Sequence, residues 1–277
     1  MMTIRQALSE AEKTLAQVPD PRVDAELLLA HVLGMDRLSL RLWDTKELNC
    51  EQEQRFASLL LSRTQRVPLQ YLIGSQGFYG LEILTDSRAL IPRPETELLC
   101  EMGIAFLQGK KHPVALDLCT GTGAIAIALK HECPAAEVHA ADLSADALSL
   151  ARENARRNQA EITFHQGDLF APVEGLRFDL ILSNPPYIPT LDCRTLQPEV
   201  QQEPLMALDG GADGLDFYRR IAKEAPAHLL PGGLLAVEVG DGEAESVQQL
   251  FTEAGLQNAS IHHDLAGLPR MVSADFT

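Results

Sequence analysis

The segment VALDLCTGTGAIAIAL, residues 114–129, joins two kinds of secondary structure through a glycine turn. Residues 114–118 form a short apolar run typical of a buried strand, and a helix is favoured from Ala124 onward. The turn between them, residues 119–123, contains Gly121 and Gly123, and small residues let a backbone approach a ligand closely. The segment therefore predicts a strand, a tight loop and a helix.

The same alternation continues to the end of the chain. Strands are predicted at residues 138–141, 162–165, 180–182 and 234–239, and helices at residues 98–107, 145–157 and 217–229. Strands that alternate with helices form a mostly parallel sheet covered by helices on both faces. We therefore predict an α/β fold for this part of the chain.

The chain before residue 94 has a different texture. Apolar residues recur at helical spacing over residues 4–18 and 24–33, and a third helix is predicted to start at Asn49, with Gln52 placed for a capping box. Glycines at positions 74, 77 and 80 separate two short strand-like runs, which indicates a β-hairpin. We expect a small helical domain over residues 1–73, a hairpin linker over 74–93 and the α/β domain over 94–277.

Composition and cysteine spacing exclude several kinds of protein. The chain has 277 residues, is 45% hydrophobic and has no apolar run near the roughly 20 residues of a membrane span. Its start lacks the apolar core of a signal peptide, so we expect a cytoplasmic protein with no membrane partner. The five cysteines are never spaced as C-x-x-C and the eight histidines show no metal spacing. We therefore expect reduced cysteines and no metal site.

The charge is strongly negative and unevenly distributed. The net charge is −16, whereas residues 1–75 carry nine Lys or Arg against ten Asp or Glu, so the acidic surplus lies almost entirely beyond residue 75. A protein whose main ligand is a phosphate backbone usually has a basic surplus. We therefore expect no stable nucleic-acid binding.

The glycine loop and the next strand predict a cofactor site. In an open parallel sheet, ligands bind beyond the carboxyl ends of the strands. The second strand ends in Asp142, whose carboxylate can accept both hydroxyls of a ribose. A dinucleotide site needs its third glycine deeper in the helix and uses the helix N-terminus to bind pyrophosphate, whereas this chain has Ala124-Ile125-Ala126 there. No Gly-Lys-Ser/Thr phosphate loop is present either. A ribose site without a phosphate cradle suits S-adenosylmethionine. The third strand ends in Asp168-Leu169, which could receive the adenine amine and ring.

A stiff polar turn follows the strand at residues 180–182. The sequence SNPPYIP, residues 183–189, delivers Asn184, Pro185, Pro186 and Tyr187 to the same sheet edge. The Asn184 side-chain oxygen and the Pro185 carbonyl could each accept one N–H of a planar nitrogen, with Tyr187 packed on its face. The two prolines would keep these acceptors in place. This pattern predicts transfer of a methyl group to an amide or amino nitrogen.

Asn184-Pro185-Pro186-Tyr187 resembles the signature of methyltransferases that act on planar nitrogens. The whole layout is similar to the release factor glutamine methyltransferase family, because a helical domain, a hairpin and Ile91-Pro92-Arg93-Pro94-Glu95-Thr96-Glu97 precede the α/β domain. Glu203-Pro204, Ala207-Leu208, residues 210–215 and Pro231-Gly232-Gly233 also match. The resemblance covers nearly the full chain.

The resemblance implies a fold, a reaction and a set of site residues. The fold would be a Rossmann-like, seven-stranded sheet with its last strand antiparallel. The enzyme would methylate the side-chain amide of the glutamine in the Gly-Gly-Gln motif of class I peptide-chain release factors, and its product would be S-adenosylhomocysteine. The helical domain would hold the release factor. Cofactor contacts would fall on Cys119, Thr120, Gly121, Thr122, Gly123, Asp142, Asp168, Leu169 and Asn184, and the catalytic and substrate-binding residues would be Asn184, Pro185, Pro186 and Tyr187.

Two positions depart from the family pattern. Cys119 stands where the loop commonly has its first glycine, and the C-terminal strand ends in Ser273-Ala274-Asp275-Phe276-Thr277 without the usual glycine. Cys119 restricts the backbone, and no histidine beside it supports a nucleophile. The roles of Arg93 and Glu97 stay open between closing the cofactor pocket and capping a helix.

Three other functions remain as alternatives. The same Asn-Pro-Pro-Tyr chemistry could serve adenine or guanine in DNA or RNA, against which the charge of −16 counts. A nucleotide-dependent oxidoreductase is supported by the sheet and the glycine loop alone. A catalytically silent binding protein would bind the cofactor without transferring its methyl group.

Overall fold

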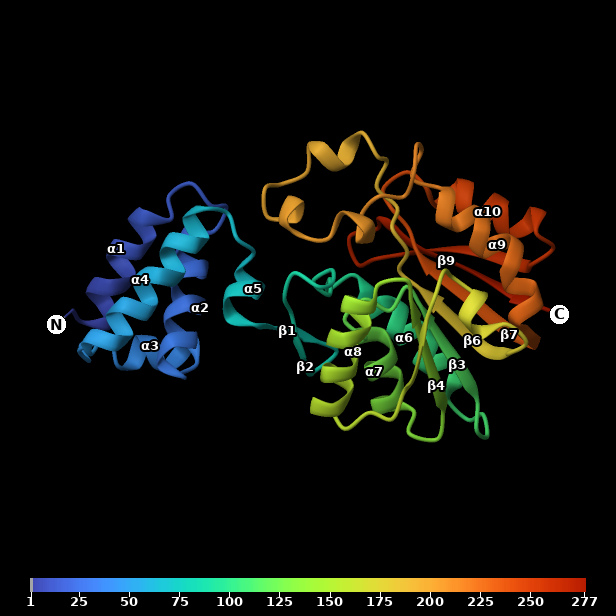
Figure 1. The fold of residues 1–277 in the computed structure, drawn as a ribbon, viewed down its shortest axis with the longest axis horizontal. Helices are drawn as coiled ribbons and strands as arrows, with labels where there is room; N and C mark the ends of the chain where they lie inside the picture. The colour runs from blue at the N-terminus through green and yellow to red at the C-terminus, as the bar shows by residue number, and fades with distance from the viewer. Residues whose placement is uncertain (1) are drawn as a thin grey trace. The chain divides into compact units, whose positions relative to one another are not determined.

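The computed structural model describes residues 2–277, which form two compact units (Figure 1). The first comprises the described residues up to Ser75 together with Gln197–Gln202, and the second comprises Gln76–Leu196 and Glu203–Thr277. Each unit has its own hydrophobic core. Within residues 2–277, no helix combines the length and the apolar character that crossing a bilayer would require.

The first unit is helical, as predicted. Its helices are α1 (Ile4–Thr14), α2 (Pro21–Leu33), α3 (Arg37–Leu42), α4 (Cys50–Thr64) and α5 (Leu69–Ile73). The predicted capping box is confirmed, because Asn49 Oδ1 accepts the Gln52 backbone N–H and Gln52 Oε1 accepts the Asn49 N–H. The prediction that the first helix reaches Val18 was wrong: α1 ends at Thr14. Val18 is nevertheless buried, so the apolar spacing continues beyond the helix.

The segment Gln197–Gln202 is attached to the helices of the first unit by charged groups. Glu199 accepts hydrogen bonds from Arg63 Nη1 at 2.8 Å and from Arg66 Nε at 2.6 Å, and Arg63 Nε also donates to Asp24 at 2.7 Å. Burial alone would raise the pKa of Glu199, but the bonds from Arg66 and Arg63 outweigh it and lower the pKa to about 2. Glu199 is therefore ionised at neutral pH and holds this segment to α4 and the residues after it.

The second unit contains the hairpin and the large sheet. Its strands are β1 (Ser75–Phe78), β2 (Leu81–Leu84), β3 (Val114–Leu118), β4 (Glu137–Asp142), β5 (Thr163–Gln166), β6 (Phe178–Ser183), β7 (Leu229–Glu238), β8 (Gln257–His263) and β9 (Pro269–Phe276). Its α-helices are α6 (Thr96–Leu107), α7 (Ala124–Glu132), α8 (Ala145–Arg157), α9 (Asp216–His228) and α10 (Ala244–Glu253). Short 3₁₀ turns lie at Ala171–Val173, Asp192–Arg194, Val200–Gln202 and Leu205–Ala207. The predicted α/β fold is confirmed.

The large sheet has seven strands in the order β5-β4-β3-β6-β7-β9-β8. Strands β3 to β7 are parallel, and β9 runs antiparallel to both β7 and β8. The residues at the C-terminal end therefore complete the sheet, with Asp275 paired to Leu234 and Phe276 to Gly233. Strand β7 begins at Leu229, earlier than predicted, because it includes Pro231-Gly232-Gly233.

Both faces of the sheet are buried under helices, with α6 and α7 on one face and α9 and α10 on the other (Figure 1). Successive residues of a strand pack into the cores on opposite faces of the sheet. Ala115 and Leu180 belong to the core under α6 and α7, and Leu116 and Ile181 belong to the core under α9 and α10. A central strand buried on both faces needs a continuous apolar run, which is the pattern seen in β3 and β6. The order reverses between β3 and β6, so a crevice is expected at the carboxyl ends of these strands.

Candidate active site

A cavity of about 340 Å³ lies at the carboxyl ends of β3, β4 and β6. This volume is in the range of small-molecule sites. Of the residues expected at the site, those that line it are Cys119, Thr120, Gly121, Thr122, Asp142, Asp168, Leu169, Asn184 and Pro186. Phe78, Arg88, Pro92, Arg93 and Thr96, from the hairpin and the residues after it, form another part of the wall. Among the described residues, Gly123, Pro185 and Tyr187 do not line this cavity.

The two positions of the loop are glycines for different structural reasons. Both have a positive φ, 55° at Gly121 and 82° at Gly123. A Cβ added to Gly121 would meet no atom within 4 Å, whereas one added to Gly123 would lie 3.1 Å from Ala151 Cβ on α8. Gly121 thus leaves backbone open toward the cavity, and Gly123 lets α7 start close to α8. Cys119 also has a positive φ, 64°, which strains a residue with a side chain.

Asp117, the fourth residue of β3, holds the loop from beneath. It is fully buried, and its Oδ2 accepts hydrogen bonds from Thr120 Oγ1 at 2.5 Å and from the Ala126 backbone N–H at 3.1 Å. Its Oδ1 has no partner among the described residues. Burial raises the pKa of Asp117 to about 7 despite these bonds. The carboxyl group therefore fixes both the loop and the first turn of α7.

Asp142 joins the ends of β3 and β4. Its Oδ2 accepts the Gly121 N–H and its Oδ1 the Ser144 N–H, each at 2.8 Å. Burial raises the pKa of Asp142, and the backbone bonds act against that rise. Each carboxylate oxygen can still accept from a ligand, because it has a second lone pair.

Asp168 has a partner that the sequence did not suggest. Its Oδ2 lies 2.8 Å from Arg220 Nη2, an ion pair with α9, and the side chain is about half exposed. Next to it, Leu169 is buried and has a φ of 45°. An acidic group and an apolar side chain therefore stand together just beyond the end of β5.

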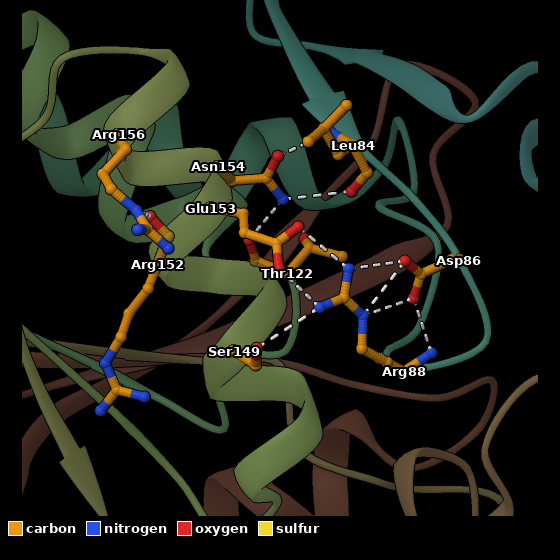
Figure 2. A network of polar contacts seen from close by, with 9 residues as sticks. All are labelled: Leu84, Asp86, Arg88, Thr122, Ser149, Arg152, Glu153, Asn154 and Arg156. Atoms are coloured by element: carbon orange, nitrogen blue, oxygen red, sulfur yellow. Dashed lines mark hydrogen bonds and ion pairs between the residues drawn. The ribbon is translucent and has the colours of Figure 1, made fainter.

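Asn154 on α8 connects the hairpin to the glycine loop (Figure 2). Its Oδ1 accepts the Leu84 N–H at 2.7 Å, and its Nδ2 donates to the carbonyls of Leu84 at 3.1 Å and Thr122 at 3.0 Å. The side chain is fully buried. One amide thus satisfies three backbone groups on two segments and fixes the hairpin beside the loop.

Arg88, which lines the cavity, forms a second network in the same region (Figure 2). Its guanidinium bonds Asp86, with Nη2 to Oδ2 at 2.7 Å, and Glu153, with Nη1 to Oε1 at 2.8 Å. The hydrogen bond from Arg88 lowers the pKa of Asp86. The hairpin and the residues after it are therefore both attached to α8, the hairpin through Asn154 and Arg88 through Glu153.

The turn at residues 184–187 is held by its neighbours. Asn184 Nδ2 donates to Thr96 Oγ1 at 3.2 Å. The Ile188 N–H donates to Leu208 O, and the Gly210 N–H donates to Ile188 O. A Cβ on Gly210 would lie 2.6 Å from Tyr187 Cα, so a glycine is required for this close approach. Tyr187 packs against the core that contains Leu116 and Ile181, close to Gly240.

Arg93 and Glu97 have separate roles. Arg93 Nη2 donates to Glu203 Oε1 at 2.5 Å, and Glu203 Oε2 accepts the Ile91 N–H at 2.9 Å. Glu97 Oε1 accepts the Tyr79 N–H at 2.8 Å. Arg93, which lines the cavity, is therefore held by Glu203. Glu97 fixes the turn of the hairpin.

Sequence reasoning gave no role to Thr96, Asn154 or Glu238. A signal existed for Glu238, because it ends the strand next to the one that delivers Asn184. Thr96 lies in the motif at residues 91–97, but its role depends on a contact with Glu238, which is distant in the sequence.

Comparisons with known proteins agree with this layout. Residues 6–74 match the model of the PrmC N-terminal domain, and residues 96–199 match that of the methyltransferase small domain. A release factor glutamine methyltransferase of Geobacter sulfurreducens is 44% identical over 98% of this chain and 95% of its own. One of Deinococcus radiodurans is 44% identical over 99% and 98%. The solved structure of a T. thermophilus 16S rRNA methyltransferase, in complex with AdoMet and guanosine, has a TM-score of 0.53 at 21% identity, covering 73% of this chain and 50% of that chain.

The sheet order and the matched domain define the second unit as a Rossmann-like methyltransferase domain. At 44% identity over almost the full length of both proteins, the family is settled as well. The chain belongs to the release factor glutamine methyltransferase family.

Proposed function

We propose that this chain transfers a methyl group from S-adenosylmethionine to the side-chain amide nitrogen of the glutamine in the Gly-Gly-Gln motif of class I peptide-chain release factors. The observation that carries this proposal is the position of Asn184. It lines the cavity that the glycine loop and Asp142 share, and its amide nitrogen is already bonded to Thr96. The family supports the choice of substrate.

The residues of the cavity fit S-adenosylmethionine. Asp142 offers two carboxylate oxygens oriented by backbone N–H groups, and the space around the Cβ position of Gly121 is open. Asp168 and Leu169 stand beside them. We propose that Asp142 holds the ribose, that Asp168 and Leu169 hold the adenine, and that residues 119–123 face the amino acid part. The related rRNA methyltransferase was solved with AdoMet.

The bound cofactor supplies an electrophilic methyl group on a sulfonium. An amide nitrogen is a poor nucleophile because its lone pair is delocalised, so its position decides the rate. We propose that Asn184 Oδ1 and the Pro185 carbonyl each accept one N–H of the substrate amide and aim its lone pair at the methyl group. Orientation of this kind lowers barriers by roughly 7–11 kcal/mol in well-placed intramolecular reactions. The amide becomes acidic as it is methylated, so it can lose its proton to the same acceptors or to water.

The direct test incubates the purified chain with S-adenosylmethionine and an unmodified release factor, then locates any added methyl group by peptide mass spectrometry. We expect one methyl group on the glutamine of the Gly-Gly-Gln motif. Asn184→Ala should abolish it, while Asn158→Ala, at the residue that follows α8, should retain it. Methylation of DNA or ribosomal RNA in parallel reactions, with none of the factor, would reject the protein substrate.

The nucleic-acid reaction is the candidate that this test must separate. The fold is shared with an rRNA methyltransferase, so the fold alone cannot exclude it. The charge of −16 opposes binding to a phosphate backbone.

We propose that the helical domain, residues 1–73, binds the release factor in the cytoplasm, where translation takes place.

A further inference from the structure

The amide of Asn184 is connected to two buried side chains. Asn184 Nδ2 donates to Thr96 Oγ1 at 3.2 Å, and Thr96 Oγ1 donates to Glu238 Oε2 at 2.6 Å. Thr96 is 4% exposed and Glu238 5% exposed. Asn184 follows β6 directly, Thr96 is the first residue of α6 and Glu238 is the last residue of β7.

The direction of these bonds follows from the number of protons available. A threonine hydroxyl has one proton to donate, and an ionised carboxylate can only accept. Once Thr96 donates to Glu238, its oxygen can only accept from Asn184. The nitrogen of the Asn184 amide must then face Thr96, and its oxygen must face away.

We propose that Thr96 and Glu238 are positioning residues that select the rotamer of Asn184 in which Oδ1 faces the substrate. This inference rests on the proposed function, because the acceptor is useful only for a substrate that donates N–H. An asparagine amide rotated by half a turn would present its own N–H groups to the substrate amide. Two donors would then face each other, and the substrate nitrogen would lose its alignment with the methyl group.

Neighbouring residues hold Glu238 and Thr96 in place. The Tyr218 hydroxyl donates to the Glu238 carbonyl at 2.8 Å, and Tyr218 is fully buried. The backbone N–H of Thr96 donates to Arg93 O at 3.1 Å. Ser183 and Val237 are register partners, so Asn184 and Glu238 leave adjacent strands at the same level. A side chain held in this way loses little of its orientation when a ligand enters.

A readout that needs no methyl transfer tests the orientation first. In the full-length protein labelled with nitrogen-15, the Asn184 side-chain amide is identified by its loss in Asn184→Asp. We expect slow exchange of one amide proton with solvent in the wild type and in Thr96→Ser, and fast exchange in Thr96→Val, which lacks the hydroxyl. Equal exchange in the wild type and Thr96→Val would overturn the proposal.

Kinetics with S-adenosylmethionine and the release factor then test the consequence. Thr96→Val should lower kcat roughly 10- to 100-fold with little change in KM for the cofactor, and Thr96→Ser should restore most of it. Thr252→Val on α10 is the matched control and should behave as wild type. Thermal melting shows which variants remain folded, and if Thr96→Val does not, Thr96→Ala replaces it.

An unchanged kcat in a folded variant without the hydroxyl would rule out the positioning role. A wild-type chain that never methylates the factor would instead reject the proposed function, and with it the catalytic role of this chain of contacts. The exchange data would still decide whether Thr96 holds the amide, so the two failures are distinguishable.

Discussion

Gly121 donates its backbone N–H to Asp142 Oδ2 over 2.8 Å, so the carboxylate proposed to hold the ribose also holds the glycine loop. Asp142→Ala should therefore affect both parts of the site. We expect at least a 100-fold loss of cofactor affinity, measured by isothermal titration calorimetry, because a charge-assisted bond and the shape of the loop are lost together. Asp142→Asn should lose less, since one oxygen remains. Equal affinity in the wild type and Asp142→Ala would contradict the assignment.

Cys119 gives a test of backbone strain. Its φ of 64° suits glycine, so Cys119→Gly should be more stable than Cys119→Ala by about 1 kcal/mol. Both variants lose the thiol, and comparing them isolates the effect of φ. At Cys133, where φ is −122°, the order should reverse. Urea denaturation monitored by circular dichroism measures all four free energies of unfolding, and the same order at both positions would refute the explanation.

Asn154 should be among the most sensitive positions of the second unit. Asn154→Ala leaves the Leu84 N–H and the carbonyls of Leu84 and Thr122 without this partner, which should cost about 2–4 kcal/mol of unfolding free energy. Because Thr122 belongs to the loop, cofactor affinity should fall too.

Asn158→Ala, at the C-cap of α8, is the matched control, because the partly exposed Asn158 side chain donates to Glu82 O and Asn154 O. We expect it to lose less than about 1 kcal/mol. If Asn154→Ala and Asn158→Ala lose similar amounts of unfolding free energy, the hydrogen bonds of Asn154 have no special role in stability.

The ionisation of Glu238 predicts a pH dependence of kcat. Burial raises its pKa to about 7; the Thr96 bond lowers it, Glu95 raises it, and Arg270 and Arg93 lower it. Protonated Glu238 can donate to Thr96, which frees the threonine proton to select the other Asn184 rotamer. The productive form needs the ionised carboxylate, so kcat should rise with pH through about 7.

Other carboxyl groups titrate in the same range, so a control must assign this rise. Burial also raises the pKa of Glu243 to about 7, and Glu243 Oε2 accepts the Gly240 N–H. The pH dependence of kcat should disappear in Thr96→Val and persist in Glu243→Gln. Its persistence in Thr96→Val would assign it to another group.

For stability the sign is the opposite of that for kcat. A carboxyl group whose folded pKa is raised binds its proton more tightly in the fold, so its contribution is full below the unfolded pKa and declines as pH rises through 7. Asp117, with a pKa of about 7, should behave in this way. The melting temperature should fall between pH 5 and 8, and fall less in Asp117→Asn than in the exposed control Glu174→Gln.

Local patterns in the sequence predict the alternation of strands and helices and the meeting of the loop with Asp142 well, because apolar periodicity and strand-end positions are local signals. The short helices α3 and α5 were not predicted, since five or six residues give little periodicity. Thr96–Glu238 and Asn154–Leu84 join residues far apart in the sequence. Neither contact has a local signature, so the residues that orient the site required the structure.

The segment Gln197–Gln202 has a consequence for dissecting this enzyme by truncation. The segment belongs to the first unit, although the residues on either side of it belong to the second. One cut near residue 75 therefore does not yield two complete fragments. A fragment starting at Gln76 would keep Glu199 but lose Arg63 and Arg66, its partners, while the other fragment would keep two arginines without their carboxylate. A loss of activity in either fragment would report the loss of these ion pairs as well as a missing domain. Substitution at the surface of the first unit is the cleaner way to test its proposed part in binding the release factor.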